Sequence, residues 1–313
     1  MKKLLTISIP TYNRAELLKI CINAIISQIP DSYIEQIELI VSNNASIDNT
    51  AAIVSEFQNK WPIIYFENES NLGPDANILK CFEKAKGKYV WIFSDDDILL
   101  PGAMPHLLAL LEKSDYGTIR LGAVGYHDDI TEVDEYYYPS DLSMDVYDDA
   151  IQFIEKINYM ATFITGIIVN KSVLTKKIDL SEFLGTYLIQ LGWVLRIAFA
   201  GMQNVDITTK LLACKQDNSG GYKFLTIFSK NYNQVLKKLV VYGLNSRIVD
   251  ITNLNIIKFY LPENINKILY KKNKSFKEEN GFLVLVTTLG AYKAFWKTIF
   301  PIYLKFWVKK FIK

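Results

Sequence analysis

The chain has 313 residues, half of them hydrophobic, and no low-complexity segment. This length and composition exclude a disordered or fibrous protein and are typical of one large globular domain, alone or with an appendage. The net charge of +2 hides an asymmetry: residues 222–313 contain 17 Lys/Arg and 4 Asp/Glu, a net charge of +13, which leaves −11 for residues 1–221. The C-terminal part is therefore expected to face an anionic partner.

The three cysteines, Cys21, Cys81 and Cys214, are isolated in the sequence. This spacing argues against a zinc site or a disulfide framework and favours a reducing compartment. The first ten residues are too polar for a signal peptide. No run of 18 uncharged apolar residues occurs, so we expect no transmembrane helix and a cytoplasmic protein.

Strands and helices alternate through the first 110 residues. Strands are predicted over residues 4–9, 37–41, 63–66 and 89–93. Helices are predicted over residues 15–28, from an N-cap at Ser46 or Asp48 to Phe57, and over residues 76–86. Strands that alternate with helices form crossover units, so the predicted fold class is α/β with a mostly parallel sheet.

Short polar segments follow all four strands. They are residues 10–14, 43–44, 71–73 and 95–97. Because ligands of open α/β sheets bind at the carboxyl ends of the strands, the pattern predicts a pocket for a polar, phosphorylated ligand. The chain has no Gly-x-Gly-x-x-Gly and no Walker loop, which argues against dinucleotide oxidoreduction and phosphate transfer from ATP.

Three consecutive carboxylates, Asp95, Asp96 and Asp97, end the apolar run of residues 89–93. Two like charges about 4 Å apart repel by roughly 1 kcal/mol in water and roughly 4 kcal/mol at an effective dielectric near 20. A divalent cation such as Mg²⁺ or Mn²⁺, which prefers carboxylate oxygens, would supply the counter-charge. The alternative is a solvated acidic turn that caps the helix after Pro101.

These motifs resemble the nucleotide-sugar-binding half of the family-two glycosyltransferases of GT-A fold. The resemblance is carried by residues 9–14, 41–48, 71–77 and 89–97. Within the family, the chain most resembles the bacterial abequosyltransferase-like enzymes that build O-antigen and other surface polysaccharides. The resemblance covers residues 4–110 closely and residues 160–201 loosely. It implies transfer of a sugar from a nucleotide-diphosphate-sugar to a saccharide or polyprenyl-linked saccharide acceptor.

The resemblance also implies roles for individual residues. The nucleotide-sugar would contact residues of all four strand ends, namely Pro10, Thr11, Asn13, Asn43, Asn71, Asn77, Asp95 and Asp96. The divalent cation, Mg²⁺ or Mn²⁺, would be held by Asp97 and Asp95 and would neutralise the diphosphate leaving group. Common members carry another aspartate where this chain has Ser94, so the division of roles among the three carboxylates stays open.

Asn43 stands where many relatives have an aspartate, at the contact to the nucleotide base. A carboxylate can accept the N3–H of uracil, whereas cytosine offers an acceptor at N3, to which an amide can donate. We therefore hypothesise a preference for a CDP-sugar. The alternative is that Asn43 is a neutral turn residue.

An inverting transferase needs a general base, usually a carboxylate, to take the proton of the acceptor hydroxyl. In the family, this base belongs to an acidic pair before a helix that ends in Arg-x-x-x-x-Gly. Here Arg196 and Gly201 match the ending, but the acidic position is Gln190, which cannot act as a base. Glu182 and, second, Asp179 are the predicted substitutes, although either could instead stabilise a helix macrodipole.

The middle of the chain offers further candidates. A strand is predicted over residues 120–126, a loop over residues 132–147 and a strand over residues 162–171. Asp128 and Asp129 are alternative bases. His127 is a conceivable acid, base or metal ligand, with an ordinary surface-loop histidine as the alternative. The tyrosines of residues 136–138 could stack on sugar rings or pack internally.

The C-terminal region is predicted to be helical, over residues 227–242 and 245–260, followed by a basic segment at 267–277. Residues 291–313 contain eight aromatic residues and six lysines, and no acidic residue follows Glu279. Around Pro301, lysines four residues apart would lie on one side of the helix and the aromatic rings on the other, as in helices that lie in a membrane interface. Each lysine would contribute about 1 kcal/mol at an anionic surface. The alternative is an aromatic face that packs on the catalytic domain.

The prediction is therefore a GT-A domain over residues 1–221, with donor binding in 1–110 and the acceptor side in 111–221. A helical extension covers residues 222–313 and includes a membrane-surface segment at 291–313. The chain would act peripherally on the inner face of a bacterial cytoplasmic membrane, without a nucleic-acid partner. Two alternative functions remain. An NDP-sugar nucleotidyltransferase usually needs a Gly-rich basic loop, which residues 10–14 lack. A catalytically inactive nucleotide-sugar-binding or scaffold protein would be compatible with the glutamine at position 190.

Overall fold

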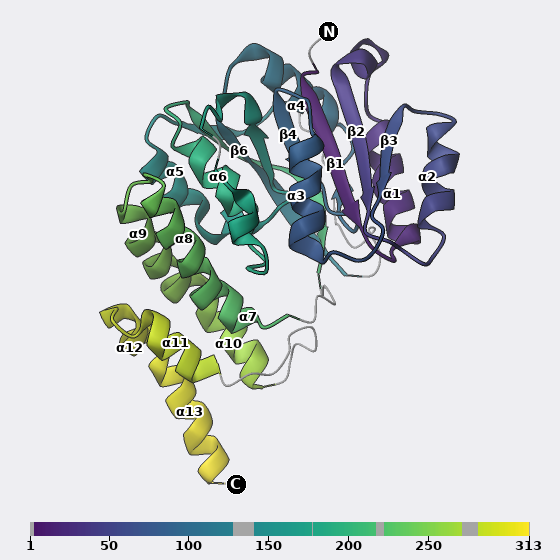
Figure 1. The fold of residues 1–313 in the computed structure, drawn as a ribbon. Coiled ribbons are helices and arrows are strands. Elements are labelled where there is room, and N and C mark those ends of the chain that lie inside the picture. Colours follow the sequence, from purple (N-terminus) through teal and green to yellow (C-terminus); the bar gives the residue numbers. More distant parts are fainter. Residues whose placement is uncertain (1–2, 128–140, 177, 217–221, 271–280, 313) are drawn as a thin grey trace. The chain divides into compact units, whose positions relative to one another are not determined.

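The computed structural model describes residues 3–127, 141–176, 178–216, 222–270 and 281–312 (Figure 1). By their internal contacts, the described residues form two compact units. The first comprises those within 1–153, 160–185 and 189–216, and the second those within 154–159, 186–188 and 217–313. Each unit is described by itself.

The first unit begins with the predicted alternation of strands and helices. Its elements are β1 (Leu5–Thr11), α1 (Ala15–Ile26), β2 (Ile37–Asn43), α2 (Thr50–Gln58), β3 (Ile63–Glu67), α3 (Pro74–Lys84) and β4 (Tyr89–Ile92). The strands lie in the order β3-β2-β1-β4 and are all parallel, which confirms the α/β class. β1 runs two residues further than predicted, because Pro10 and Thr11 still pair in register with Ser42 and Asn43 of β2.

The sheet continues with strands of mixed direction. They are β5 (Ile98–Leu99), β6 (Thr118–Tyr126), β7 (Met144–Tyr147), β8 (Ile167–Asn170) and β9 (Asn204–Lys215). From β4 the order is β8-β6-β9-β5, with β7 also paired to β9; β8 is antiparallel to both β4 and β6. The prediction of a loop over 132–147 is wrong at its described end, where β7 pairs with β9. The strand predicted over 162–171 is confined to β8, because residues 158–162 form a 3₁₀ helix.

Helices cover both faces of this sheet. α1 buries Leu18, Cys21 and Ile22 against one face together with α4 (Ala103–Lys113). On the other face, Phe82 of α3 stacks on Trp193 of α6 (Leu191–Ala198), with ring centroids 4.2 Å apart. Figure 1 shows α3 and α6 in front of the sheet and α1 behind it. The remaining helix that begins in this unit is α5 (Ala150–Ile157). The buried strands β1 and β4 thus lie in the middle of the sheet, with helices on both faces.

The second unit is helical, as predicted. Its elements are α7 (Phe224–Thr226), α8 (Tyr232–Val241), α9 (Arg247–Asn255), α10 (Leu261–Leu269), α11 (Gly281–Leu289), α12 (Lys293–Thr298) and α13 (Phe300–Phe311). Two π-helical segments, residues 227–231 and 256–260, join α7 to α8 and α9 to α10. Pro301 lies in the first turn of α13, where its missing N–H and fixed φ are tolerated.

The aromatic side chains of α12 and α13 pack within this unit. Phe282 of α11 contacts the rings of Phe295, Phe300, Tyr303 and Trp307, with centroids 4.8–6.3 Å apart. These four rings therefore have a partner on α11 within this unit, and the membrane-surface segment at 291–313 stays a prediction. Among the described residues, no helix is both long and apolar enough to cross a membrane.

Candidate functional site

The three carboxylates that follow β4 are buried. Asp95, Asp96 and Asp97 are 3, 6 and 4% exposed, and α4, the helix after Pro101, has Gly102 as its N-cap residue and no side-chain cap. The solvated, helix-capping turn that was the alternative interpretation is therefore wrong. Buried carboxylates need counter-charges or hydrogen bonds, so their partners define the site.

Arg14, at the start of α1, supplies one counter-charge. Its Nη1 donates to Asp95 Oδ1 at 2.9 Å and to Asp96 Oδ2 at 2.8 Å. Thr11, the last residue of β1, donates its hydroxyl to Asp95 Oδ2 at 2.7 Å. The end of β1 and the end of β4 are neighbours because the two strands pair in parallel. The first strand end therefore supplies one positive charge and a hydroxyl donor to two of the three aspartates.

Asp97 has neutral partners in this arrangement. Its Oδ1 accepts the backbone N–H of Lys215 at 3.1 Å, and the Thr165 hydroxyl also hydrogen-bonds to it. Burial, followed by the charge of Asp96, raises the pKa of Asp97 to about 7. Burial also raises the pKa of Asp95, to about 6, because the Arg14 charge offsets only part of the desolvation.

These residues fit a cation that is held only partly by protein. Within the described ranges, no three His, Cys, Asp or Glu side chains converge as a preformed metal centre. Mg²⁺ typically sits on one or two carboxylates together with the phosphates of a ligand. A carboxylate such as Asp97, buried with neutral partners and with a raised pKa, gains most from such a cation.

The loops after β1 and β2 are tied to each other beside this cluster. Asn13 has a φ of 53°, in the left-handed region that Asn tolerates better than most residues. Its N–H donates to Ser46 Oγ and its Oδ1 accepts the Ile47 N–H, both at 2.8 Å. Ser46 therefore supports the Asn13 loop rather than capping α2, whereas Asp48 accepts the Thr50 N–H at the start of that helix.

Asn43 ends β2 as a buried residue with both ends of its amide engaged. Its Oδ1 accepts the Ser46 N–H at 2.9 Å, and its Nδ2 donates to the Tyr65 hydroxyl at 2.8 Å. Tyr65 in turn donates to Glu67 Oε2 at 2.9 Å. The hydrogen bond to Ser46 supports the turn-residue interpretation, and it leaves one N–H of Nδ2 for another acceptor.

Asn71 and Asn77 belong to a second polar network, at the ends of β2 and β3. Asn71 Oδ1 accepts from Asn44 Nδ2 at 2.9 Å, and Asn71 itself is exposed. Asn77 is buried, donates to the Ser42 carbonyl and accepts from the Ser42 hydroxyl at 2.7 Å. Asn71 therefore lies at the surface of the site, whereas Asn77 holds α3 against β2.

The two predicted bases lie on a separate segment, residues 179–183, whose 3₁₀ helix (Leu180–Phe183) packs against α3. Asp179 caps this helix, because its Oδ1 accepts the Ser181 N–H at 2.9 Å; Glu182 is exposed within it. Gln190 is buried and donates to the Thr162 carbonyl at 2.7 Å. Gly201, with a φ of 81°, follows the end of α6.

Of the other candidates, His127 is exposed and its carbonyl accepts from Lys215 Nζ at 2.6 Å. Asp128, Asp129 and residues 136–138 lie outside the described residues. Four residues that contact the cluster were not predicted from the sequence: Arg14, Thr165, Lys215 and Tyr126. The Tyr126 hydroxyl donates to the Asp96 carbonyl at 2.7 Å. Of these four, only Arg14 could have been found from the sequence, because it is a cationic residue in the polar segment 10–14, and residues 95–97 form an acidic segment at a neighbouring strand end.

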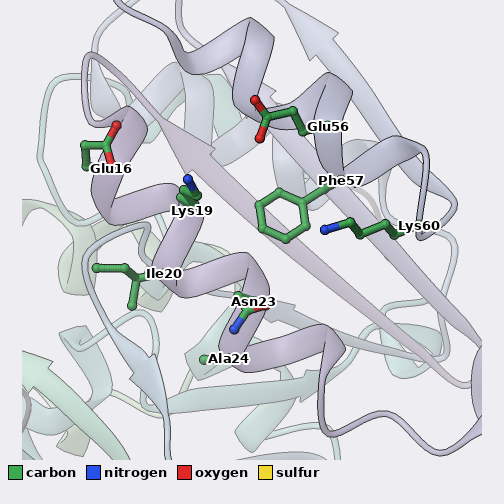
Figure 2. Close-up of a pocket in the computed structure, with 8 residues that line it drawn as sticks. All are labelled: Glu16, Lys19, Ile20, Asn23, Ala24, Glu56, Phe57 and Lys60. Carbon is green, nitrogen blue, oxygen red and sulfur yellow. The ribbon is translucent and has the colours of Figure 1, made fainter.

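A separate groove of about 540 Å³ lies between α1 and α2 (Figure 2). Its charged lining is of both signs, with Glu16 and Lys19 on α1 and Glu56 and Lys60 facing them around Phe57. None of the predicted site residues lines it. The groove is therefore distinct from the strand-end site.

Curated glycosyltransferases share stretches of sequence with this chain. A stretch of 112 residues is 39% identical to the abequosyltransferase RfbV of Salmonella typhimurium, covering 35% of this chain and 33% of that protein. Another, of 115 residues, is 35% identical to the GalNAc(5)-diNAcBac-PP-undecaprenol beta-1,3-glucosyltransferase of Campylobacter jejuni, covering 36% and 35%. The aligned stretches thus span about a third of the length of these curated relatives.

Solved structures share the fold. TarS 1–349 of S. aureus in complex with UDP aligns over 86% of this chain and 75% of its own, with a TM-score of 0.63 at 13% identity. The mannosyltransferase PcManGT of Pyrobaculum calidifontis, in complex with GDP-Man and Mn²⁺, aligns over 99% and 87%, with a TM-score of 0.52 at 16% identity. The family model for glycosyl transferase family 2 matches residues 6–174, more than half of the chain. The chain, with its GT-A-like sheet and its strand-end site, is a member of glycosyl transferase family 2.

Proposed function

We propose that this chain transfers a sugar from a nucleotide-diphosphate-sugar to a saccharide acceptor. The observation that carries the proposal is the buried Asp95–Asp97 cluster, which ends β4 beside Thr11 and Arg14. Family membership supports the reaction class. Residues 1–221 would form the transferase domain, with donor binding in 1–110 and the acceptor side in 111–221, and residues 222–313 a helical extension.

The donor site would be built from the strand ends. Pro10, Thr11 and Asn13 would lie under the nucleotide, with Asn71 at the rim, and Asp95 and Asp96 would face the ribose and the sugar. Asn77 would act from behind, through Ser42 of β2. The hydrogen bonds between the loops at residues 11–14 and 43–48 support this arrangement, because they hold both loops before a ligand arrives.

Asp97 and Asp95 would hold Mg²⁺ or Mn²⁺ together with the donor's diphosphate. When bound, the cation supplies the positive charge that stabilises the departing nucleoside diphosphate. Arg14 would keep Asp95 and Asp96 ionised and oriented, since its guanidinium contacts one oxygen of each. The raised pKa of Asp97 supports its role as the carboxylate that most lacks a counter-charge.

The proton of the acceptor hydroxyl would go to Glu182 or, second, to Asp179. Glu182 is exposed on the 3₁₀ helix, and Asp179 lies at its N-terminus, where its Oδ1 accepts the Ser181 N–H. Gln190 cannot accept a proton at neutral pH. Turnover that persists in both Glu182→Gln and Asp179→Asn would remove both from this role.

The base preference is a separate proposal. One N–H of Asn43 Nδ2 is not used by Tyr65, and cytosine N3 is an acceptor that it can serve. We therefore expect CDP to bind more tightly than UDP, and Asn43→Asp to reverse that order. Exclusive binding of UDP to the unaltered chain would contradict this preference.

The acceptor is proposed to be a polyprenyl-linked saccharide of a surface polysaccharide such as O-antigen, and the chain to act peripherally on the inner face of a bacterial cytoplasmic membrane. The net charge of +13 in residues 222–313 supports attachment to anionic lipid. The name of the Campylobacter jejuni relative, which specifies an undecaprenol-linked acceptor for that protein, is compatible with it.

Calorimetric titration with UDP and CDP, each with and without Mn²⁺, tests the donor site. We expect metal-dependent binding of one nucleotide, lost in Asp97→Asn and retained in Asp115→Asn, a carboxylate 67% exposed and paired with Lys88. No binding of either nucleotide would contradict the proposal. Nucleotide binding without turnover of any NDP-sugar would instead identify the inactive, scaffold alternative.

A further inference from the structure

One face of α13 exposes apolar side chains in a helical stripe. Leu304, Val308, Phe311 and the following Ile312 are 47, 47, 90 and 80% exposed. At 3.6 residues per turn, these positions fall within an arc of about 100°. The opposite face carries Tyr303, which is 4% exposed and packs on Phe282. We refer to Leu304, Val308, Phe311 and Ile312 as the α13 stripe.

Lysines flank the stripe and line a cavity beside it. A cavity of about 360 Å³ lies between α10 and α13, lined by Asn266, Tyr270, Pro301, Ile302, Lys305 and Lys309. The Lys309 ammonium lies 5.5 Å from the centre of the Tyr270 ring, which also lines the cavity. Two ammonium groups and one amide suit an anionic headgroup.

The charge around the stripe selects its partner. Residues 281–312 contain no Asp or Glu, whereas Lys293, Lys297, Lys305, Lys309 and Lys310 are all exposed. A second copy docking through the same stripe would bring these like charges together, which disfavours self-association. An anionic bilayer offers both an apolar layer for the stripe and negative headgroups for the lysines.

We propose that the α13 stripe inserts into the surface of an anionic phospholipid bilayer, with Lys305 and Lys309 binding a lipid headgroup in the α10–α13 cavity. This inference rests on the proposed peripheral membrane attachment and assigns it to the α13 stripe instead of the rings that pack on Phe282. The aromatic rings serve the attachment indirectly, because their packing on Phe282 fixes which face of α13 is presented.

Sedimentation of the full chain with vesicles tests the proposal. The chain should sediment with vesicles of phosphatidylglycerol and phosphatidylcholine in a 3:7 ratio. It should bind vesicles of phosphatidylcholine alone more weakly. The double variant Leu304→Gln, Val308→Gln should bind both vesicle types at least about tenfold more weakly, because two apolar side chains no longer insert into the bilayer. The double variant Lys305→Gln, Lys309→Gln should bind the anionic vesicles about thirtyfold more weakly. Its binding to phosphatidylcholine vesicles should be nearly unchanged.

Matched controls come from α8 and the segment before it. Val241 is 83% exposed, so Val241→Gln is the control for the stripe variant. Lys230 and Lys237 are also exposed, so the double variant Lys230→Gln, Lys237→Gln is the control for the lysine variant. Circular dichroism confirms folding of each variant. The proposal fails if the folded chain does not sediment with anionic vesicles, if the control variants lose as much binding as the stripe variants, or if the stripe variants change the oligomeric state instead.

Nucleotide titration of the same variants separates this inference from the proposed donor site. The stripe variants should bind nucleotide as the unaltered chain does. Loss of vesicle binding with nucleotide binding intact supports the stripe. Vesicle binding by a chain that binds no nucleotide would contradict the transferase proposal alone.

Discussion

The backbone N–H of Lys215 donates to Asp97 Oδ1 at 3.1 Å, across 118 residues of sequence. Lys215 is the last residue of β9, and Asp97 precedes β5, which pairs with β9. The end of a late strand therefore fixes the last carboxylate of a cluster that belongs to the first hundred residues. The site is assembled by the completed sheet and not by the four parallel strands alone.

Asp97→Asn is expected to make the metal-free protein more stable at pH 8 and to leave its stability nearly unchanged at pH 4. The folded pKa of Asp97, about 7, lies above the value near 4 of an unfolded chain. Between these values the folded state holds a proton that the unfolded state has lost, so the stability of the unaltered protein falls as pH rises from 4 to 7. The Asn variant lacks this dependence, and the difference should reach roughly 2 to 4 kcal/mol.

Urea denaturation at several pH values in the presence of EDTA measures this difference. The comparison at pH 4 is its internal control, because the Asp97 side chain is then neutral in the folded state. If Asp97→Asn were less stable than the unaltered protein at pH 8, the prediction would be wrong, and the neighbouring groups would have to stabilise the ionised Asp97 carboxylate.

Arg14→Ala should destabilise the fold, and Arg14→Lys should do so less. The alanine variant leaves Asp95 and Asp96 buried without the guanidinium, and we expect a cost of about 1 to 3 kcal/mol, since Arg14 is 30% exposed. Lysine restores the charge without the planar fork. Added Mn²⁺ should raise the melting temperature of Arg14→Ala more than that of the unaltered chain. Equal responses would argue that Arg14 and a cation do not share the same carboxylates.

Lys171→Met should destabilise α3 at its C-terminus. Lys171 Nζ donates to the carbonyls of Phe82, Glu83 and Ala85 at 2.6, 3.1 and 2.9 Å, which are groups that the helix end leaves without partners. We expect a loss of about 1 to 3 kcal/mol in the free energy of unfolding. Lys84→Met, an exposed lysine in the same last turn, is the control and should cost much less. Similar losses for both would refute a capping role.

Gly122→Ala should cost more than about 2 kcal/mol, whereas Gly125→Ala, three residues along the same strand, should cost less than half as much. A Cβ at Gly122 would lie 2.3 Å from the backbone oxygen of Thr209, at the register shift between β6 and β9. At Gly125 it would meet the exposed, flexible side chain of Gln216. Thermal unfolding of the two variants side by side decides whether the register shift tolerates a side chain.

The parallel half of the sheet could be predicted because its strands are short and mostly apolar and alternate with helices of regular periodicity. β9 could not, because Asp206, the third residue of the strand, is a charged residue that is fully buried. Its partner Arg120 lies on β6 and forms an ion pair with it across the sheet. A charge within a strand conceals the apolar pattern until the partner strand is known.

The acidic cluster was predictable from residue type and position alone. The contact between Lys215 and Asp97 was not, because a backbone N–H leaves no trace in the sequence. Thr165 is similar: its hydroxyl accepts the Ser94 N–H at 3.0 Å, but a threonine beside a glycine is an ordinary turn in sequence. Partners that contribute backbone groups or single hydroxyls depend on tertiary structure.

The turn of residues 94–97 is held from three directions. Thr165 binds the N–H of Ser94, Tyr126 binds the carbonyl of Asp96, and Lys215 binds the side chain of Asp97. The conformational entropy of ordering this turn is therefore lost during folding and not when a ligand arrives. A nucleotide that reaches the strand ends meets donors and acceptors already in place, so its association should proceed without a slow rearrangement of this turn.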